Sequence, residues 1–346
     1  MSSSFQSDQM EPEHVTNTVL AVAALLITSG LGLIINVYAL FALLKTRIFG
    51  AAFGRICISQ SLANLGQMIL FFCFICPMAI KDTNLFKTYL GGRPGQLLNF
   101  FWYSCIQSHL LSSINRLICL TFPLRYNKIF TKNKTTVYLV ITWILSFLLI
   151  SPQFNRECLM VFVEVDFAFK FPETDCGKVQ AKYVDFALSV SIIALIIAVD
   201  VATSVKIYCI KKYTTTTNQK QQKQIRFFFQ TVTEEIVLLL CVLSFYKVSE
   251  FFDGHWLKFF FTTWLWTFTH AIDGAIILLF NRELRWRQLK KLKKVFKKTT
   301  ERPRLLCEHP SASSETREDQ TETGLLLVAR VCTVLSPNKA SSTLER

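Results

Sequence analysis

Seven apolar stretches in this chain are long enough, or nearly long enough, to cross a lipid bilayer. Crossing a hydrocarbon core of about 30 Å takes about 20 mostly apolar residues in a helix. The stretches have to be helical, because an open strand leaves its backbone polar groups without partners in lipid. In chain order they are Val19–Leu44, Phe53–Ile80, Leu97–Thr121, Val137–Phe154, Tyr183–Ile210, Ile225–Tyr246 and Leu257–Phe280. We therefore predict an all-α membrane protein, a seven-transmembrane helix bundle.

Composition and charge agree with lipid as the solvent. Of 346 residues, 51% are hydrophobic and only 18% are charged, too few to cover a soluble domain of this size. The net charge of +14 is not taken as a sign of nucleic acid, because Lys and Arg gather in the loops between the apolar stretches. That placement indicates membrane lipid as the partner and no nucleic acid.

The third stretch is the least apolar of the seven. We expect it at the centre of the bundle, where the other six shield its polar side chains from lipid. These side chains are Asn99, Gln107, His109, Asn115 and Arg116.

The distribution of Lys and Arg predicts the orientation. If the N-terminus is outside, the inner segments 45–55, 116–134, 206–226 and 282–304 hold 25 basic residues, and the outer segments hold 9. Because basic loops stay inside, we predict an extracellular N-terminus and a cytoplasmic C-terminus. The one Asn-x-Ser/Thr triplet, at Asn133, then falls in an inner loop and should carry no glycan.

Four segments follow from this topology. Residues 1–18 are polar and lack Lys and Arg, which predicts an extracellular N-terminus and no cleavable signal peptide. Residues 19–281 form the helix bundle. Residues 282–298 combine nine basic residues with an apolar arc, which favours an amphipathic helix on the inner leaflet over a solvated basic tail. Residues 299–346 are polar and rich in Ser and Thr, which predicts a disordered cytoplasmic tail.

The sequence shows no pattern typical of an enzyme or of a metal site. There is no HExxH motif, no His-rich box and no pair of catalytic acids on an inner loop. Cys73 and Cys76 lie in a Phe-rich apolar run without a nearby His, so we expect buried thiols there and not zinc ligands. The interior of the last stretch has no Lys, which excludes a retinal Schiff base. We expect no enzymatic activity, no cofactor and no bound metal.

The segment from Asn115 to Tyr126 reads NRLICLTFPLRY. It resembles the inner end of helix three in rhodopsin-like receptors, where an acid-Arg-Tyr triplet is followed by Pro-Leu at the same offset. The resemblance implies that Asn115, Arg116, Pro123 and Leu124 take part in G-protein coupling. The alternative is that Arg116 only anchors a helix end in the lipid headgroups.

Residues 273–285 read DGAIILLFNRELR and resemble the end of helix seven in the same receptors, with an Asp273-Gly pair in place of Asn-Pro. Asn36 and Asn64 suit the polar positions of helices one and two. The amide of Asn64 replaces the usual acid, which argues against a sodium-linked switch. Because intramembrane polar groups are costly unless paired, we expect Asn36, Asn64, Asp273 and Asn281 to form an intramembrane polar network.

A narrower resemblance is to the nematode serpentine receptor class X chemoreceptors. It covers nearly all of residues 30–285 and rests on the runs Phe53 to Asn64, Asn115 to Tyr126, Phe228 to Gln230 and His270 to Asn281. It implies a rhodopsin-like G-protein-coupled receptor of a sensory neuron, in the plasma membrane or the sensory cilium. A small organic ligand and a heterotrimeric G protein would be its partners.

One feature departs from rhodopsin-like receptors, which usually carry a Cys at the outer end of helix three, bonded to the second outer loop. That position falls near Gly91 and Gly92, where the chain has no Cys. The loop itself contains Cys158 and Cys176, on the oxidising side. We expect a disulfide between them that stabilises the loop by about 3 kcal/mol.

Asp200, Glu234 and Glu235 are acids inside the fifth and sixth stretches. A charged group there costs at least about 2.5 kcal/mol unless it is paired. One interpretation is that one of these acids pairs with Arg116 and restrains the resting state. The other is that they are protonated and hydrogen-bonded to neighbouring backbone.

Aromatic residues in the outer halves of the helices are candidates for a ligand pocket. They are Trp102, Tyr103, Phe245, Trp264 and Trp266. Aromatic walls with few ions suit a small, mostly apolar organic ligand. The alternative for about half of them is a place at the lipid interface.

A transporter or an ion channel is the competing interpretation of the whole chain. It needs a polar stripe through the bundle, which His109, Asp200, Glu234 and Asp273 could supply. No internal repeat is evident, which argues against a transporter.

Overall fold

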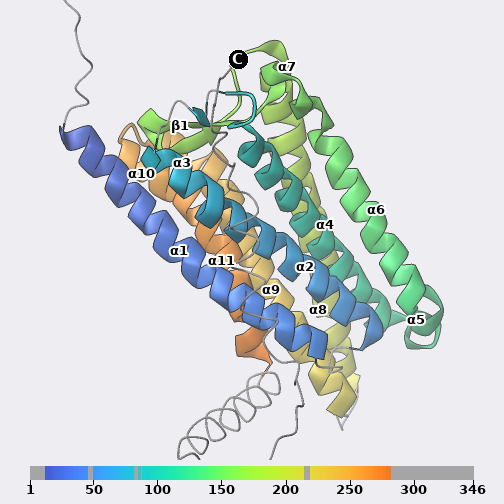
Figure 1. The fold of residues 1–346 in the computed structure, drawn as a ribbon. Helices are drawn as coiled ribbons and strands as arrows, with labels where there is room; N and C mark the ends of the chain where they lie inside the picture. Colours follow the sequence, from blue (N-terminus) through green and yellow to red (C-terminus); the bar gives the residue numbers. More distant parts are fainter. Residues whose placement is uncertain (1–11, 46–49, 82–84, 87, 214–218, 282–346) are drawn as a thin grey trace, which may run out of the picture. The chain divides into compact units, whose positions relative to one another are not determined.

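Figure 1 shows the chain as a computed structural model, which describes residues 12–45, 50–81, 85–86, 88–213 and 219–281. Residues 1–11, the amphipathic segment predicted at 282–298 and the tail predicted at 299–346 lie outside the described residues. The bounds of the last two segments stay predictions, whereas the first helix, predicted to begin at Val19, begins at Pro12.

The described residues form seven long helical segments that match the seven predicted stretches. They are α1 (Pro12–Lys45), α2 with α3 (Ala51–Leu70 and Cys76–Lys81), α4 (Arg93–Thr121), α6 (Lys132–Ile150), α7 with α8 (Asp175–Val179 and Leu188–Tyr213), α9 (Gln219–Tyr246) and α10 with α11 (His255–Phe259 and Leu265–Phe280). The three double segments continue through π-helical turns at Phe71–Ile75, Gln180–Ala187 and Phe260–Trp264. Such turns inside a long helix often mark functional sites.

Six of the helices built by these residues are long and apolar enough to cross a membrane. The remaining one, α4, contacts α2, α6, α8 and α9, and its residues Asn99, His109, Asn115 and Arg116 are buried among them. α1, α6 and α8 instead expose many Leu, Ile, Val and Phe side chains, as helices facing lipid do. The predicted seven-helix membrane fold is confirmed, and α4 tolerates its polar residues because helices and not lipid surround it.

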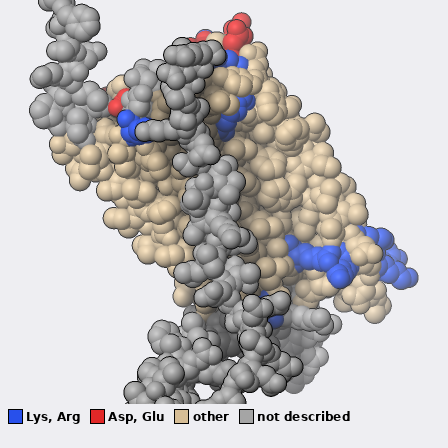
Figure 2. All heavy atoms as spheres, in the orientation of Figure 1, with Lys and Arg blue, Asp and Glu red and all other residues tan. Residues whose placement is uncertain are grey.

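The two ends of the bundle differ in structure and charge. The hairpin end holds two short strands, β1 (Val161–Val163) and β2 (Ala168–Lys170). The opposite end, here called the α5 end, holds the short helix α5 (Pro123–Ile129). Figure 2 shows Lys and Arg without Asp or Glu at the α5 end, whereas both signs of charge occur at the hairpin end.

The sequence around Pro123 determines the break between α4 and α5. Proline lacks a backbone N–H and disfavours helical geometry in the preceding residue, so Phe122 is non-helical, with φ −126° and ψ 61°. Pro123 then begins α5, where a missing N–H costs nothing. After α5, Thr131 caps α6 by accepting a hydrogen bond from the Lys134 N–H at 3.2 Å.

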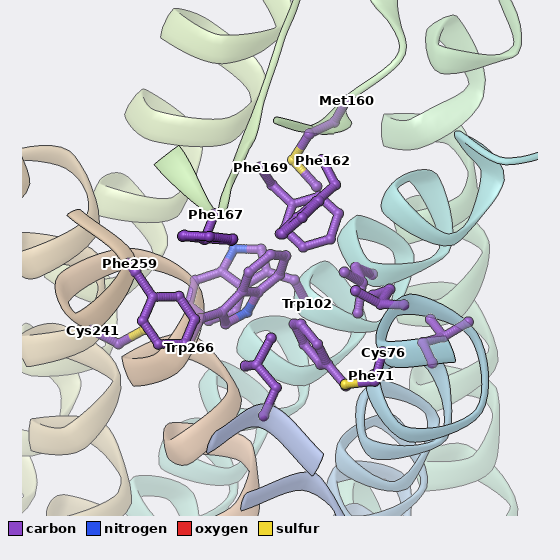
Figure 3. Close-up of a cluster of buried hydrophobic side chains, with 14 of the residues drawn as sticks. Phe71, Cys76, Trp102, Met160, Phe162, Phe167, Phe169, Cys241, Phe259 and Trp266 are labelled. Carbon is purple, nitrogen blue, oxygen red and sulfur yellow. The ribbon is translucent and has the colours of Figure 1, made fainter. Parts of the chain in front are cut away.

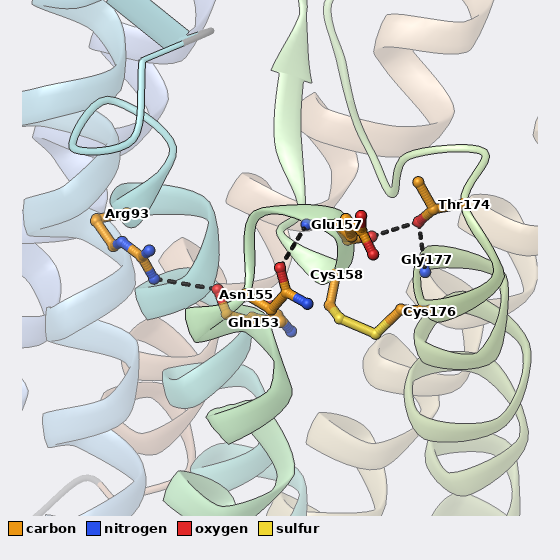
Figure 4. The surroundings of a disulfide bond; sticks show 8 residues. All are labelled: Arg93, Gln153, Asn155, Glu157, Cys158, Thr174, Cys176 and Gly177. Carbon is orange, nitrogen blue, oxygen red and sulfur yellow. Dashed lines mark hydrogen bonds between the residues drawn. A yellow bond between two sulfur atoms is a disulfide. The ribbon is translucent and has the colours of Figure 1, made fainter.

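The strands β1 and β2 pair antiparallel, with Val161 opposite Lys170. A disulfide joins Cys158, before the hairpin, to Cys176, after it, with 5.1 Å between the Cα atoms (Figure 4). These are the two cysteines paired in the prediction from the sequence. Gly95 of α4 lets the chain before β1 come close, because a Cβ there would lie 2.3 Å from the Met160 carbonyl oxygen.

Aromatic residues of the hairpin pack into the bundle and not against solvent. Phe167 and Phe169 are buried in one cluster with Trp102 and Trp266 (Figure 3). The rings of Phe169 and Trp266 meet edge to face with centroids 5.9 Å apart. Thr263 donates a hydrogen bond to the Phe167 carbonyl oxygen at 2.7 Å, which ties the hairpin to the helix leading into α11. The hairpin is therefore a lid over the middle of the bundle.

Candidate functional site

A small cavity of about 30 Å³ lies under the hairpin lid. Its walls are Asn99, Trp102, Met160, Asp185, Cys241, Val242, Phe245, Tyr246 and Trp266. A wider opening of about 250 Å³ at the hairpin end shares four of these residues, Met160, Asp185, Phe245 and Tyr246. The shared walls make one passage into the bundle. Pockets that bind organic ligands have volumes from about 300 Å³ upward. The volumes of the cavity and its opening add up to nearly this value.

A buried carboxylate, Asp185, stands in the wall that the cavity and its opening share. It belongs to the π-helical turn between α7 and α8. Tyr103 of α4 donates a hydrogen bond to Asp185 Oδ1 at 3.0 Å, and Tyr246 of α9 donates one to Oδ2. No Lys, Arg or His of the described chain forms an ion pair with it. Two phenols thus hold the Asp185 carboxylate in place as a hydrogen-bond acceptor in the wall shared by the cavity and its opening.

Three aromatic side chains, Trp102, Phe245 and Trp266, form the apolar wall of the cavity. The ring centroid of Trp266 lies 6.3 Å from that of Trp102 and 6.1 Å from that of Phe245, both edge to face. Trp102 Nε1 donates to Ser189 Oγ at 3.1 Å, and Trp266 Nε1 donates to His270 Nε2 at 3.1 Å. Because their N–H groups are satisfied, the two indoles offer apolar ring surface to the cavity.

Deeper in the bundle, three of the four residues of the predicted polar network come together. Asn64 of α2 donates to Asp273 of α11, and Asn64 Oδ1 lies 2.7 Å from His270 Nδ1. Asn36 of α1 donates to the His270 carbonyl oxygen at 3.0 Å. Gly274 makes room for Asn36, since a Cβ there would lie 2.7 Å from Asn36 Oδ1. His270 is a member of this network that was not predicted.

Asn281 has a different partner from the other three. Its amide donates to Gln230 Oε1 at 2.7 Å, and Gln230 donates to Glu234 Oε1 at 2.9 Å, both on α9. Among the described residues, Asn281 forms no hydrogen bond with Asn36, Asn64 or Asp273 and is linked through Gln230 to Glu234. Asn281 lies about 12 Å further along the helix axis than Asp273, since each helical residue adds about 1.5 Å. It ties α11 to α9 instead.

At the α5 end, Arg116 is buried, with 3% of its surface exposed. Its guanidinium has no hydrogen-bond partner among the residues that the structure describes. The group lies 4.6 Å from the ring centroid of Phe53 on α2, a cation–π contact. Phe53 in turn packs against Phe227 of α9, with centroids 5.3 Å apart. Arg116 is thus a buried charge that lies against one phenylalanine ring, and a second phenylalanine packs on that ring.

The other residues of the Arg116 motif lie around this corner. Asn115 Nδ2 donates to Tyr126 Oη of α5 at 3.3 Å. Burial raises the pKa of Tyr126 above its ordinary value, which keeps the phenol protonated. Pro123 starts α5, and Leu124 beside it is 92% exposed. The motif therefore combines one buried cation, Arg116, with one exposed apolar side chain, Leu124.

Comparison with known proteins identifies the family of this chain. Residues 26–281 match the family described as "Serpentine type 7TM GPCR chemoreceptor Srx", which spans all seven helical segments. The chain belongs to this chemoreceptor family. It is 25% identical over 306 residues to "Serpentine receptor class X 45" of Caenorhabditis elegans, covering 80% of this chain and 82% of that protein. "Serpentine receptor class X-43" of the same species is 27% identical over 191 residues, covering 51% of this chain and 58% of the relative.

Membership of the class X receptors confirms the family resemblance seen in the motifs. It also favours a receptor over the transporter or channel alternative, because the matched family is one of chemoreceptors.

Two of the five predicted pocket residues of this class X receptor do not line the cavity. Tyr103 instead donates to the wall residue Asp185. Trp264 does not line the cavity, and its Nε1 donates to Thr28 of α1 at 3.1 Å. Its ring stacks between Phe260 and Phe268 on its own helix. Trp264 precedes Trp266 by two residues, and two residues turn a helix by about 200°, so the two indoles face nearly opposite sides.

The interpretation that an intramembrane acid pairs with Arg116 is not supported by an ion pair in the arrangement seen here. Within the described chain Arg116 forms no ion pair with Asp200, Glu234 or Glu235. Glu235 accepts a hydrogen bond from Ser113 Oγ at 2.6 Å, and Glu234 accepts one from Gln230. Both side chains thus accept hydrogen bonds from other side chains, whereas the second interpretation placed their partners in the backbone.

Asp185 and Tyr246 were not singled out from the sequence as site residues. An acid near the start of the fifth apolar stretch was a usable signal, since ionisable groups in such a segment tend to be functional. Tyr246 gave no such signal, because an aromatic residue at a helix end usually sits at the lipid interface.

Proposed function

We propose that this protein is a plasma-membrane chemoreceptor that binds a small organic ligand at its hairpin end and activates a heterotrimeric G protein at its α5 end. The observation that carries the proposal is Arg116, a buried cation without a hydrogen-bond partner among the described residues. A buried charge left unpaired is costly. That cost is offset if the guanidinium gains a partner in a second conformation, when a Gα subunit docks.

The distribution of charge supports placing the α5 end inside the cell. On the face that Figure 2 shows, basic residues without acids lie at that end, and α5 and the start of α6 supply Arg125, Lys128, Lys132 and Lys134. Positive loops favour the cytoplasmic side. The hairpin end, with its disulfide, then faces the oxidising exterior, where such bonds persist.

The cavity indicates a mostly apolar ligand with one polar group. Trp102, Phe245 and Trp266 supply the apolar surface, and Asp185 supplies a single acceptor. A ligand with a hydroxyl or an amine directed at Asp185 satisfies that carboxylate, whereas an acidic ligand is repelled by it. Because the cavity alone holds about 30 Å³, binding requires the hairpin lid or its neighbours to shift.

Helix α9 connects the two ends. It contributes Phe245 and Tyr246 to the cavity, and its Phe227 packs on Phe53, the ring that lies against Arg116. A ligand that favours a different position of α9 also moves Phe227 away from Phe53 and uncovers the guanidinium. The ligand then shifts the population of two arrangements of α9, and the exposed Leu124 adds apolar contact for the docking Gα subunit.

The test is a screen of organic compounds on cells that co-express the receptor, a promiscuous Gα subunit and a calcium reporter. Arg116→Ala should abolish the response to any active compound at equal surface expression. Arg55→Ala is the matched control, because Arg55, on α2, also lies near the α5 end but donates to the Lys132 carbonyl oxygen at 2.8 Å. It should signal like the parent. If Arg116→Ala signals like the parent at equal surface level, coupling does not depend on this residue and the proposal fails.

A further inference from the structure

Three buried ionisable side chains from three helices converge in the middle of the bundle. They are His109 of α4, Glu234 of α9 and Asp273 of α11. Each offers one nitrogen or oxygen ligand atom, and these atoms all lie within 4.8 Å of one another. Their exposed fractions are 0%, 2% and 6%. The residues are far apart in the sequence, so only the packing of the bundle brings them together.

Atoms of this cluster lack partners. Neither ring nitrogen of His109 has a hydrogen-bond partner within the described chain, and the same holds for Glu234 Oε2. His109 Nδ1 and Glu234 Oε2 are 4.0 Å apart, too far for a hydrogen bond. An enclosed cavity of about 10 Å³ lies among the three side chains. Buried polar atoms are nearly always paired, and such a space holds one small particle, about the size of a water.

The charges around the cavity favour a cation as that particle. Asp273 receives an amide hydrogen bond from Asn64, and Glu234 receives one from Gln230. No Lys or Arg of the described residues forms an ion pair with either carboxylate. Two ionised carboxylates this close repel each other in a medium of low dielectric constant, and either a proton on one of them or a cation between them removes the repulsion.

We propose that His109, Glu234 and Asp273 form a binding site for a divalent transition metal of the Zn²⁺ type. One imidazole nitrogen with two carboxylate oxygens is a ligand set that Zn²⁺ accepts, with a water in the fourth position. Mg²⁺ and Ca²⁺ take six or more oxygen ligands, which this cluster does not offer. Zn²⁺ binds such atoms at about 2.0–2.2 Å, so the side chains close in by roughly 1 Å to reach it.

Such an ion would clamp α9 to α4 and α11. Each ligand comes from a different helix, so any outward displacement of α9 has to break the Glu234 ligation. Metal binding therefore stabilises the arrangement seen here and opposes the one that uncovers Arg116. The effect on signalling rests on the proposed function, whereas binding of the metal does not.

The experiment uses the full-length receptor, purified in detergent, stripped with a chelator and then titrated with ZnCl₂. We expect about one bound zinc per chain by elemental analysis, as a single site requires, and a melting temperature that rises with zinc concentration. MgCl₂ and NaCl at matched ionic strength should not reproduce this rise. His109→Ala, Glu234→Gln and Asp273→Asn should each weaken zinc binding by at least about tenfold.

His255→Ala is the matched control, because His255 lies at the hairpin end and outside the cluster. It should bind zinc like the parent. Absence of bound zinc in the parent overturns the proposal, and so does zinc binding that none of the three cluster variants weakens. A rise in melting temperature that NaCl alone produces and that His109→Ala removes assigns the site to a monovalent cation and also overturns it. None of these outcomes involves a G protein, so a failure of the coupling proposal stays distinguishable.

Discussion

At the scale of single residues, the ligand cavity depends on Asp185. Its two oxygens accept from Tyr103 and Tyr246, which belong to two different helices. The carboxylate therefore joins α4 and α9, and in the proposed function it is also the polar group that meets the ligand.

Replacing Asp185 with Asn keeps the shape of the side chain but turns one acceptor into a donor. One of the two phenols then faces an N–H group, and an unsatisfied buried donor costs about 1–3 kcal/mol. We expect a lower melting temperature for the purified receptor. We also expect at least a tenfold loss of potency, about 1.4 kcal/mol, for agonists with a hydroxyl or amine.

Asp253→Asn is the control for this change, since Asp253 is exposed in the loop before α10. It should alter neither the melting temperature nor the potency. Equal stability and potency for Asp185→Asn and the parent would show that this carboxylate is not an anchor.

At the scale of elements, the hairpin lid depends on the disulfide between Cys158 and Cys176, which are 18 positions apart. Closing a loop of this size stabilises a fold by about 3 kcal/mol in the chain-entropy model. The double change Cys158→Ser and Cys176→Ser should lower the melting temperature. It should also speed tryptic cleavage after the exposed Lys170 of β2, because the hairpin loses its tie.

Cys209→Ser is the matched control, because Cys209 is a free thiol on α8. It should leave both readings unchanged. Peptide mapping of the non-reduced parent should yield the linked Cys158 and Cys176 peptides. Two free thiols in the surface-expressed receptor would sink the prediction.

At the scale of the whole molecule, the orientation in the membrane decides which end meets the ligand. The basic loops predict that Asn133 faces the cytoplasm and carries no glycan. Phe5→Asn introduces an acceptor triplet with Gln6 and Ser7 in the segment predicted to be outside. Glycosidase treatment should reduce the mass of this variant and leave the parent unchanged. A glycan mapped to Asn133 would reverse the topology and place the cavity on the inner side.

The seven membrane helices were predictable because length and apolarity are local properties that lipid imposes on each segment alone. The central place of α4 followed from its polar residues by the same reasoning. The partner of Cys158 was also predictable, because both cysteines lie in one loop. None of these predictions depends on how a helix is rotated about its axis.

Helix rotation is what the tertiary packing determines, and the sites depend on it. It turns Trp266 into the cavity and Trp264 towards α1, and it places Arg116 against the ring of Phe53. It also brings Asp185 to two tyrosines and gathers the His109 cluster from three helices. A helix in lipid gains little from any single rotation, and many weak packing contacts with its neighbours decide the angle. Those contacts join residues distant in the chain, and no local pattern in the sequence records them.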